Sequence, residues 1–390
     1  MPPQKDEIRA RQARLAQKLL ENQLDAALIR YPLNIFYFSG AFVDGHLVVT
    51  AQAQTYLLVF RTIERAKEEA WVDEIFSFRS LKKLPSFLED LGAKRLALEE
   101  DRLPVQVYRG YQRLLKDFQL ADLSPLVREI RAIKSPYEIA CLRQAARMLK
   151  EALEVFWPKV REGLSELELA GLLEAELRKR GHPACTRTYA FHQELAYGHL
   201  LAGSSGAIPA YVTTGQGGPG VVGYPQGPSF KELRENEPLL IDYAGWFEGY
   251  MVDQSRIFCL GELPADLQSA FSKVQELLEA LEEKLRPGVL AQEIYLYAFE
   301  LAERLGIVNE LMAHGPEKVP FIGHGVGLEI DEWPPIAPKA EIVLQEGMVI
   351  ALEPKLHFPG RALIGLEDTF LITASGAERL TIFPREVMCK

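Results

Sequence analysis

The chain has 390 residues, enough for two or three domains, and its apolar content is ordinary for a packed globular protein. Its 44 basic and 54 acidic residues give a net charge of −10, which argues against general affinity for phosphate backbones, so we expect no nucleic-acid partner. The sequence contains neither a secretory signal nor an apolar run long enough for a membrane span, so we expect no membrane association.

The cysteines are scattered and form no C-x-x-C pair, which argues against a zinc ribbon or a disulfide framework. This pattern fits the reducing cytoplasm, which is the compartment that we expect. The four cysteines are Cys141, Cys185, Cys259 and Cys389.

The first third of the chain alternates short apolar runs with helical stretches, after an amphipathic helix at 6–21. Such alternation is typical of a layered α/β domain, which we predict for residues 1–133. The apolar runs cover 26–29, 34–38, 47–50, 56–60 and 95–98, and the helical stretches cover 63–70 and 81–91.

A domain boundary is predicted in the segment RAIKSP at 131–136, where Ser135-Pro136 supplies a helix start with Pro in the first turn. The second domain would then cover residues 134–390. It opens with two predicted helices, at 137–156 and 165–180, followed by an irregular Gly- and Pro-rich region at 186–230.

Two strand-like runs at 239–258 flank a short turn, and each run carries one aspartate, Asp242 or Asp253. If residues 247 and 248 form a two-residue hairpin loop, Asp242 and Asp253 face each other directly. Aspartate is depleted inside strands, and facing like charges are destabilising. The pair therefore predicts a bound divalent cation.

Two further helices are predicted at 264–285 and 291–305, and strand-like runs at 321–330, 348–352 and 363–373. The three runs carry His324 between glycines that allow close backbone approach, Glu353 at the end of VIALE, and Glu367 within LIGLEDTFLIT. Taken singly, such a histidine is more often structural and such a glutamate solvated.

Together, four carboxylates and one imidazole are too acidic for a structural zinc site but suit two hard or borderline cations with bridging carboxylates. We therefore predict two divalent ions, with Mn²⁺, Co²⁺, Fe²⁺ and Zn²⁺ as the candidates. The predicted ligands are Asp242, Asp253, His324, Glu353 and Glu367.

The order of these motifs, D, then D-x-[ST]-R eleven residues later, then GHG-x-G-L-E, EP and L-E-D-T, resembles the creatinase/methionine aminopeptidase family of pita-bread metallopeptidases. The segment RAIKSPYEIACLRQA and the N-terminal domain resemble the aminopeptidase P and prolidase branch, the Xaa-Pro peptidases. The resemblance implies an α+β pita-bread domain behind the α/β N-terminal domain.

The resemblance also implies that the five predicted ligands hold two ions, with a bridging water as the nucleophile and Glu353 as the proton acceptor. The implied activity is hydrolysis of short peptides at Xaa-Pro bonds. Homodimers are common among the proteins that this chain resembles, so a homodimer is expected.

Three positions depart from the peptidase pattern. Ala210 and Asp331 stand where the branch usually carries histidines, and Gly365 stands where a basic residue often precedes the last ligand. Asp331 is either a solvated acid or a catalytic acid or base near the metals. Candidates to replace the missing groups are His192, Tyr197 and His199, although the sequence alone favours a structural or surface role for each.

Two alternatives to a peptidase remain open. The altered positions are compatible with a non-peptidase enzyme of the same fold, such as a creatinase-like hydrolase or a sulfoniopropionate lyase-like enzyme, that acts on a small metabolite. A binding protein that kept the pocket without the chemistry is the other alternative, but five clustered ligands argue against it.

Overall fold

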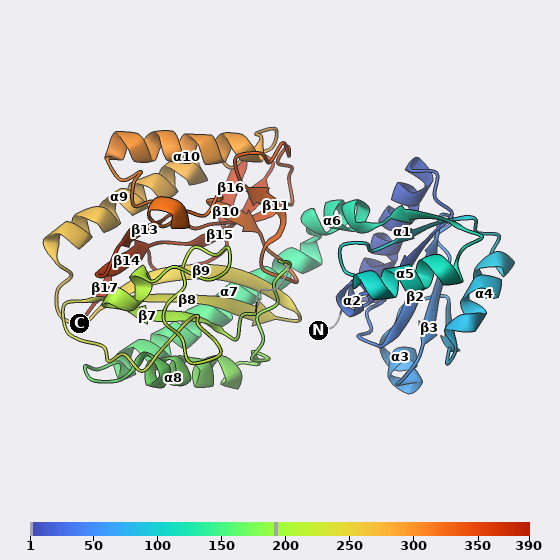
Figure 1. Cartoon of the computed structure of the whole chain (residues 1–390), viewed down its shortest axis with the longest axis horizontal. Helices are drawn as coiled ribbons and strands as arrows, with labels where there is room; N and C mark the ends of the chain where they lie inside the picture. Colours follow the sequence, from blue (N-terminus) through green and yellow to red (C-terminus); the bar gives the residue numbers. More distant parts are fainter. Residues whose placement is uncertain (1–2, 191–193) are drawn as a thin grey trace. The chain divides into compact units, whose positions relative to one another are not determined.

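A computed structural model describes residues 3–190 and 194–390 of the chain (Figure 1). The chain divides into two compact units, Met1–Arg131 (unit 1) and Ala132–Lys390 (unit 2). Each unit has its own sheets and its own hydrophobic core. The domain limits of 1–133 and 134–390 remain a prediction.

Unit 1 is a six-stranded mixed sheet with the strand order β4-β3-β2-β1-β5-β6, in which β1 pairs antiparallel with β2 and parallel with β5. The apolar run at 34–38 is not a strand, because Pro32 occupies the first turn of a helix that includes the run. The strands are β1 (Ala26–Ile29), β2 (Gly45–Thr50), β3 (Thr55–Val59), β4 (Glu74–Ser77), β5 (Arg95–Leu98) and β6 (Gln119–Asp122), and the helices are α1 (Lys5–Glu21), α2 (Pro32–Ser39), α3 (Ile63–Glu69), α4 (Leu84–Asp90), α5 (Val105–Leu114) and α6 (Ser124–Ala132).

Unit 2 opens with the helix predicted from Ser135-Pro136. Ser135 caps it, and Glu138 completes a capping box. The helices of unit 2 are α7 (Pro136–Phe156), α8 (Glu166–Lys179), α9 (Ala265–Glu282) and α10 (Ala291–Leu305).

The sheets of unit 2 lie between two helical layers, α7 with α8 and α9 with α10 (Figure 1). A four-stranded sheet has the order β17-β9-β8-β7, a five-stranded sheet has the order β11-β10-β12-β15-β16, and β13 pairs with β14. The strands are β7 (Gly198–Ala202), β8 (Pro238–Phe247), β9 (Tyr250–Cys259), β10 (Gly323–Gly325), β11 (Glu332–Ile336), β12 (Val349–Leu352), β13 (Lys355–Phe358), β14 (Ala362–Gly365), β15 (Asp368–Thr373), β16 (Gly376–Arg379) and β17 (Met388–Cys389).

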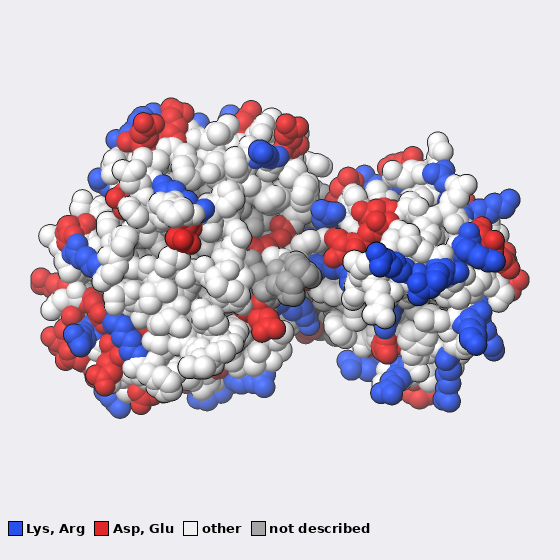
Figure 2. Space-filling view, viewed as in Figure 1, with Lys and Arg blue, Asp and Glu red and all other residues white. Residues whose placement is uncertain are grey.

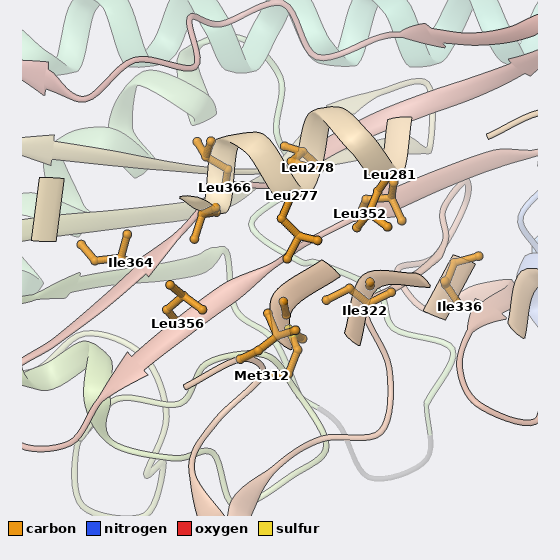
Figure 3. Packing of buried hydrophobic residues seen from close by; sticks show 14 of the residues in the cluster. Leu277, Leu278, Leu281, Met312, Ile322, Ile336, Leu352, Leu356, Ile364 and Leu366 are labelled. Atoms are coloured by element: carbon orange, nitrogen blue, oxygen red, sulfur yellow. The ribbon is translucent and has the colours of Figure 1, made fainter. Parts of the chain in front are cut away.

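The larger hydrophobic core of unit 2 lies between α9 and these strands. Figure 3 shows Leu277 and Leu281 of α9 among the side chains of this core, together with Leu352 and Leu356. All four are fully buried, and burial of one leucine contributes about 1.5–3 kcal/mol. Because Leu352 and Leu356 stand on either side of residues 353–355, the core anchors that segment.

The register of the β8/β9 hairpin differs from the prediction by two residues. The loop is Glu248-Gly249, where both residues have positive φ (50° and 93°), as a tight two-residue turn requires. Asp242 therefore faces Ser255, and Asp253 faces Ala244. A shift of two keeps both aspartates on one face of the sheet as diagonal neighbours, which still brings like charges together.

On the face drawn in Figure 2, basic and acidic side chains are interspersed over both units, and a large part of unit 2 carries neither. Among the residues that the structure describes, every helix is too short or too polar to cross a lipid bilayer.

Arg256 on β9 holds the chain on both sides of the predicted ligand Glu367. Its guanidinium is fully buried and donates to the Glu367 carbonyl at 2.7 Å, the Asp368 carboxylate at 2.6 Å and the Pro384 carbonyl at 2.7 Å. Glu367 lies in the break between β14 and β15 and not within a continuous strand. Arg256 therefore fixes a ligand whose own backbone lies outside a strand.

We expect Arg256→Met to lower the free energy of unfolding of unit 2 by about 3–5 kcal/mol, because it leaves a buried carboxylate and several carbonyls short of a donor. Urea unfolding followed by tryptophan fluorescence measures this loss. The control is Arg143→Met, which removes a half-exposed ion pair with Glu378 and should cost less than about 1 kcal/mol. Equal losses in the two variants would contradict the role assigned to Arg256.

Candidate metal centre

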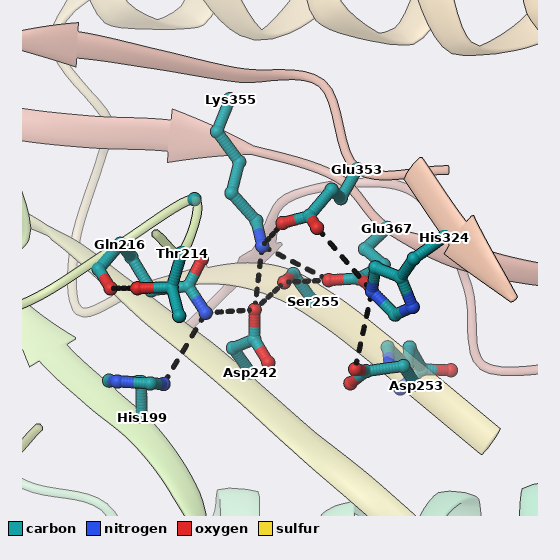
Figure 4. A network of polar contacts seen from close by, with 12 residues as sticks. His199, Thr214, Gln216, Asp242, Asp253, Ser255, His324, Glu353, Lys355 and Glu367 are labelled. Atoms are coloured by element: carbon teal, nitrogen blue, oxygen red, sulfur yellow. Dashed lines mark hydrogen bonds and ion pairs between the residues drawn. The ribbon is translucent and has the colours of Figure 1, made fainter. Parts of the chain in front are cut away.

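The structure brings the five predicted ligands together in one buried cluster of unit 2 (Figure 4). They come from four parts of the chain: the β8/β9 hairpin, β10, the end of β12 and the break before β15. The relative exposures are Asp242 6%, Asp253 8%, His324 6%, Glu353 4% and Glu367 1%.

The glycines beside His324 are required by close backbone packing. A Cβ atom at Gly323 would lie 2.3 Å from the Ala351 carbonyl oxygen, and one at Gly325 would lie 2.5 Å from the Trp333 carbonyl oxygen. Larger residues would therefore force β10 away from its neighbours. The GHG motif places the imidazole in the cluster at a point where only glycine fits on either side.

One side of the cluster has unused donor atoms that fit a metal ion. His324 Nε2 lies 3.5 Å from Glu353 Oε1, 3.7 Å from Glu367 Oε1 and 4.0 Å from Asp253 Oδ2. Ligand atoms about 2.1 Å from a tetrahedral ion lie about 3.4 Å from one another, which is close to this spacing. We name this side, formed by Asp253, His324, Glu353 and Glu367, the histidine side.

Two details at the histidine side favour metal binding. His324 Nδ1 lies 3.1 Å from the Gly325 carbonyl and donates to it, so Nε2 is the ring nitrogen that faces the carboxylates and can bind a metal ion after losing its proton. Glu367 Oε1 is buried and lacks a hydrogen-bond partner among the described residues. A buried carboxylate oxygen without a donor is costly unless a cation binds it.

The other side of the cluster holds a cation that the sequence analysis missed. The Lys355 ammonium lies 2.8 Å from Asp242 Oδ2, 2.6 Å from Glu353 Oε2 and 3.0 Å from Glu367 Oε2 (Figure 4). We name this the lysine side. The sequence contained a signal for this lysine, since a lysine follows Glu353 by two residues and a glycine, which leaves space for a long side chain, precedes Glu367 by two.

The charges around each carboxylate determine its protonation. Burial raises the pKa of Asp242 and of Glu353, but the Lys355 ammonium outweighs burial together with His199 and Ser255 at Asp242 and with His324 at Glu353, and the net shift is downward. Burial and the Asp242 charge raise the pKa of Asp253 to about 7, and burial and the Asp253 charge raise that of Glu367 well above its usual range. The lysine side is neutralised by the Lys355 ammonium. On the histidine side, burial lowers the pKa of His324, but the neighbouring Glu353 and Asp331 carboxylates outweigh burial and raise it well above its usual range, so a proton on the imidazole supplies the positive charge that a metal ion would replace.

Asp331 and Gly365 both stand close to the cluster, whereas Ala210 lies in a loop beside the Gly217 backbone. Asp331 lines the pocket above the ligands, and its Oδ1 is 4.0 Å from His324 Nδ1. Its φ of 62° is a conformation that aspartate tolerates better than most residues. Burial raises the pKa of Asp331, although the His324 charge opposes the shift.

Of the three candidates to replace the missing histidines, Tyr197 and His199 both line the pocket. The ring nitrogens of His199 contact side-chain amides, Nδ1 at 3.3 Å from Gln216 Nε2 and Nε2 at 3.0 Å from Gln226 Nε2. Burial lowers the pKa of His199 to about 4, even though the Asp242 charge opposes the shift. His192 lies outside the described residues.

Comparison with known proteins gives matches over almost the whole chain. Residues 140–374 match the model of metallopeptidase family M24, and residues 11–133 match the creatinase/prolidase N-terminal domain. The Xaa-Pro dipeptidase of Pyrococcus furiosus is 27% identical over 383 residues, which cover 98% of this chain and 100% of that protein.

Solved structures give the same result. The X-Pro aminopeptidase of Thermotoga maritima has a TM-score of 0.82 at 25% identity, with 97% of this chain and 99% of that chain covered. The prolidase of Pyrococcus horikoshii has a TM-score of 0.80 at 25% identity, with 97% and 100% covered.

We expect the His199 ring to remain neutral between pH 8 and pH 5, because its pKa is lowered from 6.5 to about 4. The unfolded chain takes up this proton below about pH 6.5 and the folded chain does not. The contribution of His199 to stability is therefore full above pH 6.5 and declines by about 1.4 kcal/mol per pH unit toward pH 4. Histidine NMR titration measures the pKa, and a midpoint between pH 6 and 7 would contradict the prediction.

Proposed function

This chain belongs to metallopeptidase family M24, and from that premise we propose that it is a metal-dependent Xaa-Pro peptidase that hydrolyses short peptides. Relatives that match nearly its full length are Xaa-Pro dipeptidases by name, including one from Lactobacillus helveticus at 27% identity. The N-terminal match, to the creatinase/prolidase domain, supports the same branch of the family.

The observation that carries this proposal is the histidine side of the cluster. It combines an imidazole nitrogen with carboxylate oxygens, one of which is buried without a donor, and it opens on a pocket. A divalent ion held there would polarise the scissile carbonyl and lower the pKa of a water molecule. Mn²⁺, Co²⁺, Fe²⁺ and Zn²⁺ all suit a mixed set of nitrogen and oxygen donors.

Two residues of the pocket have roles in this proposal beyond binding the ion. Glu353 directs Oε1 toward the histidine side while Lys355 holds Oε2 at 2.6 Å, so Oε1 is positioned to accept the proton of an attacking water. Asp331 lines the pocket close to His324 and has a raised pKa, which suits a group that donates a proton to the leaving amine.

All five predicted ligands could hold two ions if every carboxylate oxygen were available. Lys355 engages one oxygen each of Asp242, Glu353 and Glu367.

The expected homodimer and the expected cytoplasmic location belong to this proposal as well. Size-exclusion chromatography with light scattering tests whether the protein is a homodimer.

We expect the metal-loaded protein to release free amino acids from Xaa-Pro dipeptides or from longer peptides with proline in the second position. Glu353→Gln should reduce kcat by about 10²- to 10⁴-fold, because the amide cannot accept the proton. Liquid chromatography of the products measures the released amino acids and the kcat of the wild-type protein and the variant. Failure of the loaded wild-type protein to cleave any of a broad peptide panel would reject the peptidase proposal.

The matched control for Glu353 is Glu174→Gln. Glu174 is a half-buried glutamate that accepts a hydrogen bond from the Tyr243 hydroxyl at 3.2 Å, and it does not line the pocket. This variant should retain the wild-type kcat. A loss in the control equal to that in Glu353→Gln would indicate a general effect of removing buried charge.

Asp331→Asn should lower kcat by about 10²-fold and leave KM nearly unchanged, because asparagine keeps the backbone conformation at φ 62° but cannot donate a carboxyl proton. The decline of wild-type kcat at high pH should also disappear in the variant. Unchanged kcat and pH profile would remove Asp331 from the mechanism.

A non-peptidase enzyme acting on a small metabolite is the second candidate. Asp331 and Gly365, which depart from the peptidase pattern beside the cluster, favour it. Metabolite profiling with the loaded protein distinguishes it from the first candidate, because it predicts consumption of a small nitrogen- or sulfur-containing compound and an intact peptide panel.

A further inference from the structure

We propose that the Lys355 ammonium is a built-in cation that takes the place of one of the two predicted metal ions, so that the centre binds a single divalent ion on the histidine side. The inference rests on the proposed function only for the location of that ion. It concerns how many ions the cluster holds, which can be measured without any substrate.

The contacts of Lys355 resemble those of a bound cation. Its side chain is fully buried, and its ammonium lies within 3.0 Å of three separate carboxylates, those of Asp242, Glu353 and Glu367. An ammonium has three protons and no acceptor, so three carboxylates use all of its donors.

One oxygen of the Asp242 carboxylate, Oδ2, is engaged by protein donors to a degree that leaves little for a metal. This oxygen accepts from Lys355 Nζ at 2.8 Å and from Gln216 Nε2 at 2.8 Å, and it also accepts from the Ser255 hydroxyl. Ser255 in turn reaches Glu367 Oε2 at 3.0 Å. A metal ion bound by these oxygens would have to displace several hydrogen bonds and an ammonium together.

The backbone leaves room for the lysine and for little else. Lys355 on β13 pairs with Gly365 on β14, and a Cβ atom at Gly365 would lie 2.5 Å from Lys355 Cγ. A Cβ atom at Gly215 would lie 2.5 Å from Glu353 Oε2 and 3.2 Å from Lys355 Cδ. Two glycines, Gly215 and Gly365, therefore line the path of the lysine side chain. Position 365, where peptidases of this branch often carry a basic residue, is a glycine, and this leaves the space that Lys355 occupies.

Two carboxylates connect the lysine side with the histidine side. Glu353 and Glu367 each direct Oε2 to Lys355 and Oε1 toward His324. This is the arrangement of carboxylates that bridge two cations, with an ammonium in one of the two positions. The ammonium neutralises charge but has no vacant coordination position, so activation of water depends on the histidine side alone.

The test is a count of bound ions. Wild-type protein, stripped with a chelator, dialysed against Mn²⁺ or Zn²⁺ and analysed by inductively coupled plasma mass spectrometry, should hold about one ion per chain. Crystals soaked in Mn²⁺ should show one anomalous peak beside His324 and none at Lys355 Nζ. Two ions per chain, or two anomalous peaks, would overturn the proposal.

Lys355→Ala should raise the count from about one to about two ions per chain, because it vacates the lysine side and frees three carboxylate oxygens. The control is Lys134→Ala, which removes another buried lysine, paired with Glu332 at 3.3 Å outside the cluster, and should leave the count at one. A count of one in folded Lys355→Ala would overturn the proposal. If that variant does not fold, the wild-type count and the anomalous map still decide.

The peptidase proposal and the inference of a single bound ion can be rejected independently of each other. A protein that binds one ion and cleaves no peptide retains the inference about Lys355 and loses the proposed peptidase activity. A protein that cleaves Xaa-Pro peptides with two bound ions retains the activity and loses the inference.

Discussion

Four carboxylates buried in one cluster impose the strongest constraint on unit 2, because like charges removed from water repel each other unless cations lie among them. Lys355 supplies one positive charge that is covalently attached and always present. The histidine side depends on an ion that can be exchanged. The positive charge of the centre is therefore divided between Lys355, which is permanent, and the histidine side, where a divalent ion would replace the proton of His324.

Two parts of unit 2, the apolar core under α9 and the buried contacts of Arg256, hold the segments that carry the ligands. The apolar core under α9 anchors Leu352 and Leu356 around the segment that carries Glu353 and Lys355. Arg256 ties Glu367 and Asp368 to β9, where Asp253 and Ser255 also stand. Strands distant in the sequence are thus fixed relative to one another by buried polar contacts as well as by sheet pairing, which keeps the ligand atoms in place when the ion is absent.

Much of this could be predicted from the sequence, because the signals are local. The α/β N-terminal domain and the α+β pita-bread domain are confirmed, and the predicted ligands lie together. The hairpin register was wrong because the positive φ of Glu248 is not visible in its residue type. Lys355 was missed because a lysine near a strand normally reaches solvent, and only its pairing with Gly365 across β13 and β14 reveals its direction.

The pairing of Lys355 with Gly365 makes the two positions interdependent. A side chain at position 365 and the lysine at position 355 compete for the same space, since a Cβ atom at 365 would lie 2.5 Å from Lys355 Cγ. Glycine at 365 is therefore required for Lys355 to lie where it does. A larger residue at 365 would displace the stem of the lysine side chain, and the ammonium would lose its position among the three carboxylates.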